Sequence, residues 1–172
     1  MIRLATEKDI KAIAEIYDDI HTEEEAGNLT IGWQREIYPT EATAVESVAK
    51  GEMYVAEADG KVIASAKINK EQVDVYYGAP WEFEAEDEEV LVLHTLVVSP
   101  KVMTRGTGRE FAAFYEQLAK EQGCKYLRID TNERNTRARA FYKKIGYKEI
   151  AIVPCVFNGL KNVNLVLLEK KL

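Results

Sequence analysis

The chain has 172 residues, 47% of them hydrophobic, which is enough for a sizeable core and excludes an intrinsically disordered chain. Its net charge of −6 disfavours a nucleic-acid-binding protein, and no apolar run reaches the ~18 residues of a membrane span or forms the core of an N-terminal secretion signal. Two cysteines, Cys124 and Cys155, are too few for a disulfide framework, which favours a cytoplasmic protein.

Apolar periodicity predicts an α/β chain. Helices are expected at residues 7–21 and 40–50, in a stretch marked by Phe111 and Leu118 that ends at Gly123, and at 135–145. Strands are expected at residues 2–4, 53–58, 62–68, 90–98, 126–129, 147–153 and 163–168. We therefore expect one domain over residues 1–172, with a mixed sheet of about seven strands and about four helices.

Charge is divided unevenly along the chain. Residues 1–100 carry 8 basic and 22 acidic side chains, a net charge of −14, whereas residues 101–172 carry 15 basic and 7 acidic ones, a net charge of +8. This division suits an anionic ligand on the second part and a cationic one on the first. Uneven decoration of a solvated surface explains the same charges equally well.

A loop with two glycines, VVSPKVMTRGTGREF, joins the expected strand at 90–98 to the next helix. Gly106 and Gly108 let the backbone approach a ligand closely, and a helix start offers unpaired N–H groups to a phosphate. Arg105 and Arg109 add positive charge. The loop favours a pyrophosphate site, with a plain glycine turn as the alternative; it matches neither a Walker loop nor a full dinucleotide fingerprint.

A second pattern, NTRARAFYKKIGY, occupies the helix expected at 135–145. Asn135, Ala138 and Tyr142 are spaced so that they share one side of that helix. Ala138 permits a close approach, Asn135 offers an amide for hydrogen bonds, and Tyr142 carries an ionisable hydroxyl on a rigid ring. On this pattern alone, a core tyrosine with a satisfied hydroxyl is the more ordinary explanation of Tyr142.

Together the two patterns resemble the acetyl-CoA-binding motifs of the GNAT superfamily of N-acetyltransferases. That family shows Gln/Arg-x-x-Gly-x-Gly/Ala between a strand and a helix, and later Asn-x-x-Ala-x-x-x-Tyr-x-x-x-Gly-Phe/Tyr. Met103 stands where the family usually has Gln or Arg. The other matching positions are Gly106, Gly108, Asn135, Ala138, Tyr142, Gly146 and Tyr147.

The resemblance implies a GNAT-type fold and an enzyme that moves the acetyl group of acetyl-CoA to a primary amine of a small molecule or peptide. The amine would attack the thioester directly in a ternary complex. The backbone N–H of Leu96 would polarise the thioester carbonyl, and Tyr142 would protonate the departing thiolate. The implied cofactor-binding residues are Leu96, Val97, Val98, Met103, Thr104, Arg105, Gly106, Thr107, Gly108, Arg109, Asn135, Ala138 and Tyr142.

The base that deprotonates the acceptor is left open. His94 lies two residues before Leu96 and has an ordinary pKa of about 6.5, although a packed strand histidine is an equal alternative. Glu88 and Glu89, just before the strand, would serve if burial raised their pKa; a solvated acidic loop is the more ordinary explanation. A bound water is a further alternative.

The acceptor site is expected in the segments outside the motifs, namely residues 22–38, residues 71–89 and the stretch around 157–159. Aromatic side chains that would line it are Trp33, Tyr38, Tyr76 and Trp81. Six acidic residues fall within residues 82–89, which favours a cationic acceptor.

Other functions are also compatible with the sequence. A non-catalytic acyl-CoA-binding regulatory domain would share the motifs, and a protein-interaction domain would use the acidic run for a basic partner. An enzyme of the same fold could transfer a longer acyl group, and a homodimer is compatible with the sequence. A nucleophilic triad of Cys155, His94 and Asp130 has no support from its sequence context, and the histidines and cysteines show no metal-ligand spacing.

Overall fold

The computed structural model of the chain describes residues 1–102 and 106–172. These residues form four α-helices, which are α1 (Ile10–Glu25), α2 (Glu41–Ala49), α3 (Thr107–Glu121) and α4 (Thr136–Lys144). They also form seven strands, which are β1 (Ile2–Leu4), β2 (Met53–Ala58), β3 (Lys61–Asn69), β4 (Val90–Val98), β5 (Tyr126–Asn132), β6 (Lys148–Phe157) and β7 (Leu160–Lys171). The expected α/β fold with a mixed sheet is confirmed.

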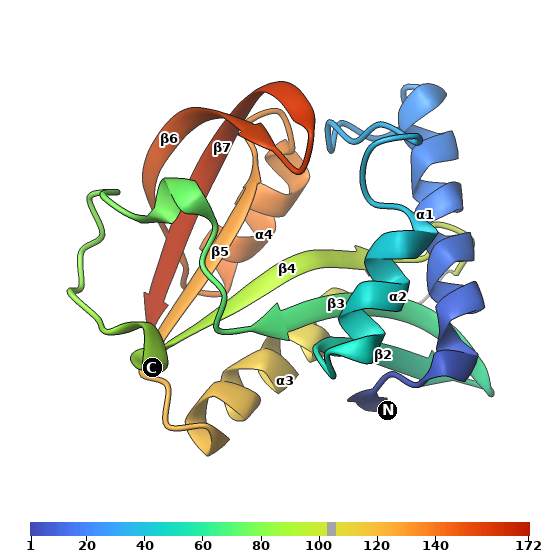
Figure 1. Cartoon of the computed structure of the whole chain (residues 1–172), viewed down its shortest axis with the longest axis horizontal. Helices are drawn as coiled ribbons and strands as arrows, with labels where there is room; N and C mark the ends of the chain where they lie inside the picture. The colour runs from blue at the N-terminus through green and yellow to red at the C-terminus, as the bar shows by residue number, and fades with distance from the viewer. Residues whose placement is uncertain (103–105) are drawn as a thin grey trace.

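All of these strands belong to one sheet in the order β1-β2-β3-β4-β5-β7-β6. Only β4 and β5 run parallel, and every other neighbouring pair is antiparallel. Helices α1 and α2 cover one face, where Ile13 and Ala44 pack against Met53 and Val55 of β2. Alternate residues of β2 face the other layer, where α3 and α4 lie (Figure 1).

The two parallel strands in the centre of the sheet part halfway along their length. Their pairing runs from Val90 opposite Tyr126 to Leu93 opposite Ile129 and goes no further. Figure 1 shows β4 and β5 diverging beyond this point. The second halves of these strands therefore leave a space inside the sheet.

A β-bulge in β4 begins where the strands part. Lys67 of β3 is opposite His94 and Ser65 is opposite Val97, so that Thr95 and Leu96 both face the single residue between them. Thr95 takes a φ of 52°, in the left-handed region that side chains other than glycine seldom adopt. Such a bulge bends the strand and leaves backbone groups outside the ladder.

The last hairpin is longer than the sequence predicts. Strand β6 continues through Pro154 to Phe157, and β7 begins at Leu160 after a two-residue turn. Strand β6 is an edge strand, which tolerates a proline whose nitrogen faces away from the neighbouring strand. The result is that Phe157 reaches the space between β4 and β5.

Residues 71–89 form a loop with two 3-10 turns, η2 (Asp74–Tyr76) and η3 (Asp87–Glu89). Tyr76 packs with Val90 and Val92 of β4 and with residues of β7. The loop therefore covers the part of the α1 and α2 face that these two helices do not reach (Figure 1). Its acidic part is paired with basic side chains elsewhere. Glu82 binds Lys148 and Glu89 binds Lys125, each at 2.7 Å.

Candidate active site

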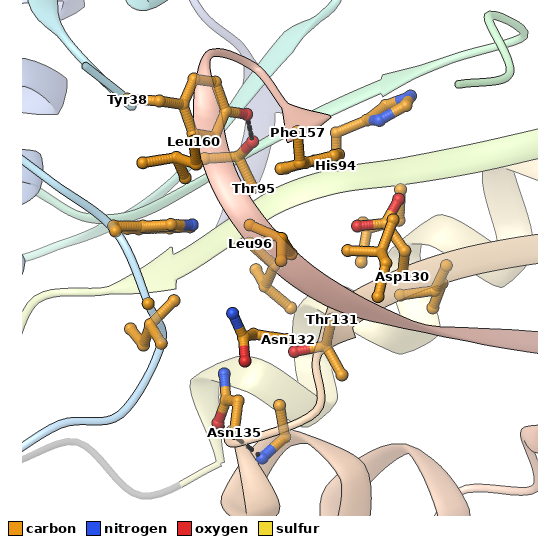
Figure 2. A pocket seen from close by; sticks show the side chains of 18 of the residues that line it. Tyr38, His94, Thr95, Leu96, Asp130, Thr131, Asn132, Asn135, Phe157 and Leu160 are labelled. Carbon is orange, nitrogen blue, oxygen red and sulfur yellow. Dashed lines mark hydrogen bonds between the residues drawn. The ribbon is translucent and has the colours of Figure 1, made fainter. Parts of the chain in front are cut away.

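A cavity of about 90 Å3 lies where β4 and β5 part. Figure 2 shows Leu96 of β4 and Thr131 and Asn132 of β5 around this space, with Asn135 at the start of α4. The remaining walls come from the segment before α2, from α4 and from the β6–β7 hairpin, through Trp33, Tyr38, Ala138, Tyr142, Phe157 and Leu160. The cavity therefore joins segments that are far apart in the sequence.

Several site residues expected from the sequence meet at this cavity. They are His94, Leu96, Asn135, Ala138 and Tyr142. Val97 and Val98 lie further along β4, where Val97 is buried under α1 and Val98 packs toward α3. The backbone between Leu96 and Val98 thus runs away from the cavity along the open side of β4.

The loop with two glycines leads into α3, and Gly106 directly precedes the helix. Gly106 takes a φ of 103°, and a Cβ built on it would meet no described atom within 4 Å, so Gly106 faces open space. Thr107 and Gly108 form the first turn of a 15-residue helix, and Arg109 is exposed. The open glycine and the N-terminus of a long helix fit a pyrophosphate group. Met103, Thr104 and Arg105 lie outside the described residues.

Asn135 has a structural task in addition to its expected one. Its side-chain oxygen accepts a hydrogen bond from the backbone N–H of Ala138 at 3.1 Å and so caps α4. Figure 2 shows the amide nitrogen turned toward Asn132. The cap fixes the side chain and leaves its N–H groups facing the cavity as donors.

Tyr142 lies on the inner side of α4 and is 6% exposed. Burial raises the pKa of its hydroxyl well above the ordinary value, and the Asp130 carboxylate raises it further. The hydroxyl is therefore protonated at neutral pH. A protonated hydroxyl at the wall of the cavity can donate a proton or a hydrogen bond.

His94 is a weak base in this fold. Its Nε2 lies 2.9 Å from the side-chain oxygen of Asn69. Burial lowers the pKa of His94 to about 4, and the positive charge of Lys67 contributes to the lowering. The imidazole is therefore neutral at pH 7, with little tendency to take a proton.

Asp130 is a stronger candidate for the base, and the sequence patterns do not select it. It lies on β5 at the cavity wall, and its Oδ2 accepts a hydrogen bond of 2.7 Å from the hydroxyl of Tyr76. Burial raises the pKa of Asp130 from 3.8 to about 6, against the opposing effect of the Tyr76 hydrogen bond. The only signal in the sequence is a carboxylate that directly follows the strand expected at 126–129.

The two other carboxylates considered from the sequence lie elsewhere. Glu88 and Glu89 belong to η3, before the paired half of β4, and neither lines the cavity. Hydrogen bonding to Lys125 lowers the pKa of Glu89, which makes it a weaker base still.

A larger cleft of about 480 Å3 adjoins the cavity, and Tyr38, His94 and Phe157 line both. Its remaining walls come from α2, the end of β3 and the first part of the 71–89 loop. They include Thr43, Glu46, Ser47, Lys67, Glu71 and Asp74. Of the 71–89 segment expected at the acceptor site, residues 71–75 line this cleft. The acidic run 82–89 lines neither space, and two of its carboxylates bind Lys125 and Lys148.

The four aromatic residues expected at the acceptor site divide into two pairs. Trp33 and Tyr38 line the cavity, and the Tyr38 hydroxyl hydrogen-bonds Thr95 of the bulge (Figure 2). Tyr76 and Trp81 instead anchor the 71–89 loop, since the Trp81 ring N–H donates to the Tyr76 carbonyl at 2.8 Å.

Comparison with known proteins places the chain in a family. Residues 10–147 match the model of the acetyltransferase (GNAT) family. The chain therefore belongs to the GNAT family and is an N-acetyltransferase. It is 25% identical over 150 residues to the uncharacterized N-acetyltransferase YhfO of Bacillus subtilis, a match that covers 86% of this chain and 89% of the relative.

Solved structures share the fold at lower sequence identity. A GNAT-family acetyltransferase of Streptococcus agalactiae superposes with a TM-score of 0.79 at 22% identity, covering 100% of this chain and 95% of the other. The Salmonella typhimurium protein yncA, solved with its cofactor acetyl-CoA, gives a TM-score of 0.69 at 17% identity, covering 99% of this chain and 92% of the other.

Within residues 1–102 and 106–172, no helix is long and apolar enough to cross a membrane.

Proposed function

We propose that the enzyme transfers an acetyl group from acetyl-CoA to a primary amine of a small molecule or peptide, by direct attack within a ternary complex in the cytoplasm. One observation carries the proposal. The space between β4 and β5 has a proton donor, Tyr142, and a buried carboxylate, Asp130, on its walls, and it adjoins a larger cleft. A ternary complex needs two adjoining spaces of this kind.

The residues around the opening suit acetyl-CoA. The N–H groups at the start of α3, with Gly106, Thr107, Gly108 and Arg109, would hold the pyrophosphate, together with Met103, Thr104 and Arg105 outside the described residues. The backbone of Leu96, Val97 and Val98 and the amide of Asn135 would hold the pantetheine arm. Bound acetyl-CoA supplies the acetyl group as a thioester.

Each of three groups on the chain has a separate task. The N–H of Leu96, outside the β3–β4 ladder pairs, would donate a hydrogen bond to the carbonyl oxygen of the acetyl group. Tyr142 would give its proton to the departing sulfur. Asp130 would accept the proton that the acceptor ammonium must lose before its nitrogen can form the new bond.

Asp130 suits this task better than His94. A free alkylammonium has a pKa of about 10.4, so transfer to a carboxylate of pKa about 6 is uphill by about 6 kcal/mol. Transfer to His94, with a pKa of about 4, adds nearly 3 kcal/mol to that cost. Burial of the ammonium in the cavity lowers its own pKa and reduces both costs.

The larger cleft would hold the rest of the acceptor. It presents the carboxylates of Glu46, Glu71 and Asp74 and the ammonium of Lys67. Lys67 already lies 3.6 Å from Glu52 and 3.7 Å from Glu71. Glu46 is also paired, with Lys50 at 2.7 Å, whereas no ion pair is recorded for Asp74 among the described residues. The excess of carboxylates over ammonium groups on the walls favours an acceptor that is itself cationic.

The proposal is tested by CoA-thiol release from acetyl-CoA against a panel of diamines, amino acid amides and short basic peptides. We expect turnover with at least one cationic amine and none with Asp130→Asn at pH 6.5. Calorimetry should show that both proteins bind CoA. If the wild type did not bind CoA, the proposed acetyl-CoA site would be wrong. CoA binding without any turnover would favour a non-catalytic regulatory domain.

A further inference from the structure

The 71–89 loop makes one polar contact with the wall of the cavity. Tyr76, at the end of η2, is 1% exposed, and its hydroxyl donates to Oδ2 of Asp130 at 2.7 Å. Among the described residues this is the one hydrogen bond recorded for that carboxylate. Oδ1 is therefore the oxygen left to meet an acceptor amine.

We propose that Tyr76 is a positioning residue for acetyl transfer, which orients the Asp130 carboxylate and holds it ionised, and that the 71–89 loop is built to deliver it. The proposal rests on the proposed function, in which Asp130 accepts the proton of the acceptor. Tyr76 itself lines neither the cavity nor the larger cleft, so it acts through Asp130.

The loop is clamped to the strand that carries Asp130. Arg128 lies two residues before Asp130 on β5, so both side chains leave the strand on the same face. The Arg128 guanidinium stacks 4.1 Å from the Trp81 ring, donates to Gln72 at 2.6 Å and donates to the Phe83 carbonyl at 3.2 Å. Three points of the loop are thus held by one side chain of β5.

The clamp extends to Tyr76 itself and to β7. Trp81, stacked on Arg128, donates its ring N–H to the Tyr76 carbonyl at 2.8 Å, and the two rings pack at 5.2 Å. Glu169 of β7 accepts hydrogen bonds from Arg128 and from the backbone of Phe83. Because the clamp and Asp130 share a strand, the hydroxyl is presented to the carboxylate at a fixed position.

The hydrogen bond stabilises the ionised carboxylate, because an ionised carboxylate can only accept hydrogen bonds and the Tyr76 hydroxyl donates one to it. The other titratable groups that face Asp130 are Tyr142 from α4, Tyr38 from the segment before α2, and Cys155 from β6. Burial raises the pKa of all three, so they are neutral between pH 5 and 8. Burial also raises the pKa of Glu169, which belongs to the clamp on β7, so the change is assigned by the NMR signal of Asp130 itself.

The test compares Tyr76→Phe with Tyr77→Phe, a matched control at the neighbouring tyrosine, which is 62% exposed. The pKa of Asp130 is measured by NMR titration of its carboxyl carbon. The acid limb, which is the rise of kcat/KM with pH as the base ionises, is measured from pH 5 to 8. We expect Tyr76→Phe to raise the pKa of Asp130 and the midpoint of the acid limb by about one pH unit each. A shift in the pKa of Asp130 from about 6 to about 7 lowers kcat/KM about fivefold at pH 6 and by less than about 1.2-fold at pH 8. Tyr77→Phe should match the wild type.

A merely structural role for Tyr76 would lower kcat/KM equally at all pH values and leave the NMR pKa in place, which would overturn the proposal. A raised NMR pKa with an unmoved acid limb would also overturn it, and would show instead that Asp130 is not the base. A second variant, Trp81→Phe, loses the hydrogen bond to Tyr76 while keeping a ring. It should move both readings in the same direction by a smaller amount, and the absence of any shift would contradict the clamp.

Discussion

Replacing Asp130 by asparagine should stabilise the protein while removing its activity. Burial raises the pKa of this carboxyl from 3.8 to about 6. Between these values the folded protein holds the proton more firmly than the unfolded chain does. The free energy of unfolding therefore falls as the pH rises through this window, and stays lower above it.

The size of the effect follows from the two pKa values. Their difference corresponds to about 3 kcal/mol at pH 8, and to about 0.5 kcal/mol at pH 4. Asparagine removes this penalty but must bury an amide and accept a weaker hydrogen bond from Tyr76. We expect Asp130→Asn to gain about 1 to 3 kcal/mol at pH 8 and to lose most of that advantage at pH 4.

Urea unfolding followed by circular dichroism at both pH values measures the effect, and Asp9→Asn is the matched control. Hydrogen bonds from Arg3 at 2.8 and 2.9 Å hold the pKa of Asp9 well below its ordinary value. Asp9→Asn should therefore be less stable than wild type by nearly the same amount at pH 8 and at pH 4, because the stabilisation is lost only as the pH falls below the ordinary pKa of 3.8. If Asp130→Asn were less stable at pH 8, or gained equally at both pH values, the assigned burial of Asp130 would be wrong.

Tyr142→Phe should lower kcat about tenfold or more with little change in CoA affinity by calorimetry, and an unchanged kcat would remove it as the proton donor. His94→Gln should leave the acid limb of kcat/KM unmoved, because a base of pKa about 4 is not the group that titrates there; a displaced limb would restore His94 as the base. Gly32→Ala should cost stability and raise KM for the acceptor, because its Cβ would lie 2.4 Å from the Asn132 side chain at the cavity wall. Gly78 also has a positive φ, but a Cβ there would meet open space. Gly78→Ala should therefore lower the free energy of unfolding in urea without changing KM for the acceptor.

The sequence carries enough information to predict most elements and the group of residues that α4 contributes to the cavity. Asn135, Ala138 and Tyr142 lie on one helix, and helical spacing alone requires them to share a face. They do line one cavity, together with Leu96. Local periodicity is sufficient wherever a group of site residues belongs to a single element.

Sequence patterns do not predict which residues meet because two strands diverge. The apolar run at β4 reads as a regular strand, and nothing in it marks the bulge at Thr95. Asp130 comes to the cavity from β5, and Tyr76 comes from a loop more than 50 residues earlier. These contacts depend on long-range packing, which no spacing along the chain encodes.

The acidic run 82–89 shows why charge counts mislead without structure. Two of its carboxylates bind Lys125 and Lys148, which belong to the basic part of the chain, and a third, Asp87, accepts a hydrogen bond from Gln72. Part of the opposite charge of the two halves is therefore satisfied within the molecule. The carboxylates that remain near the site are the fewer ones on the wall of the larger cleft.

The parting of β4 and β5 gives the site both its space and its base. Beyond Leu93 and Ile129 the two strands no longer pair, which opens the cavity. Asp130 is the first residue of β5 past that last pair, so its carboxylate lies at the wall of a small cavity instead of in bulk water. The lack of water raises its pKa toward the range in which a carboxylate can accept a proton at neutral pH. A closed sheet would lose both properties together, so substitutions that restore pairing should reduce binding and proton transfer alike.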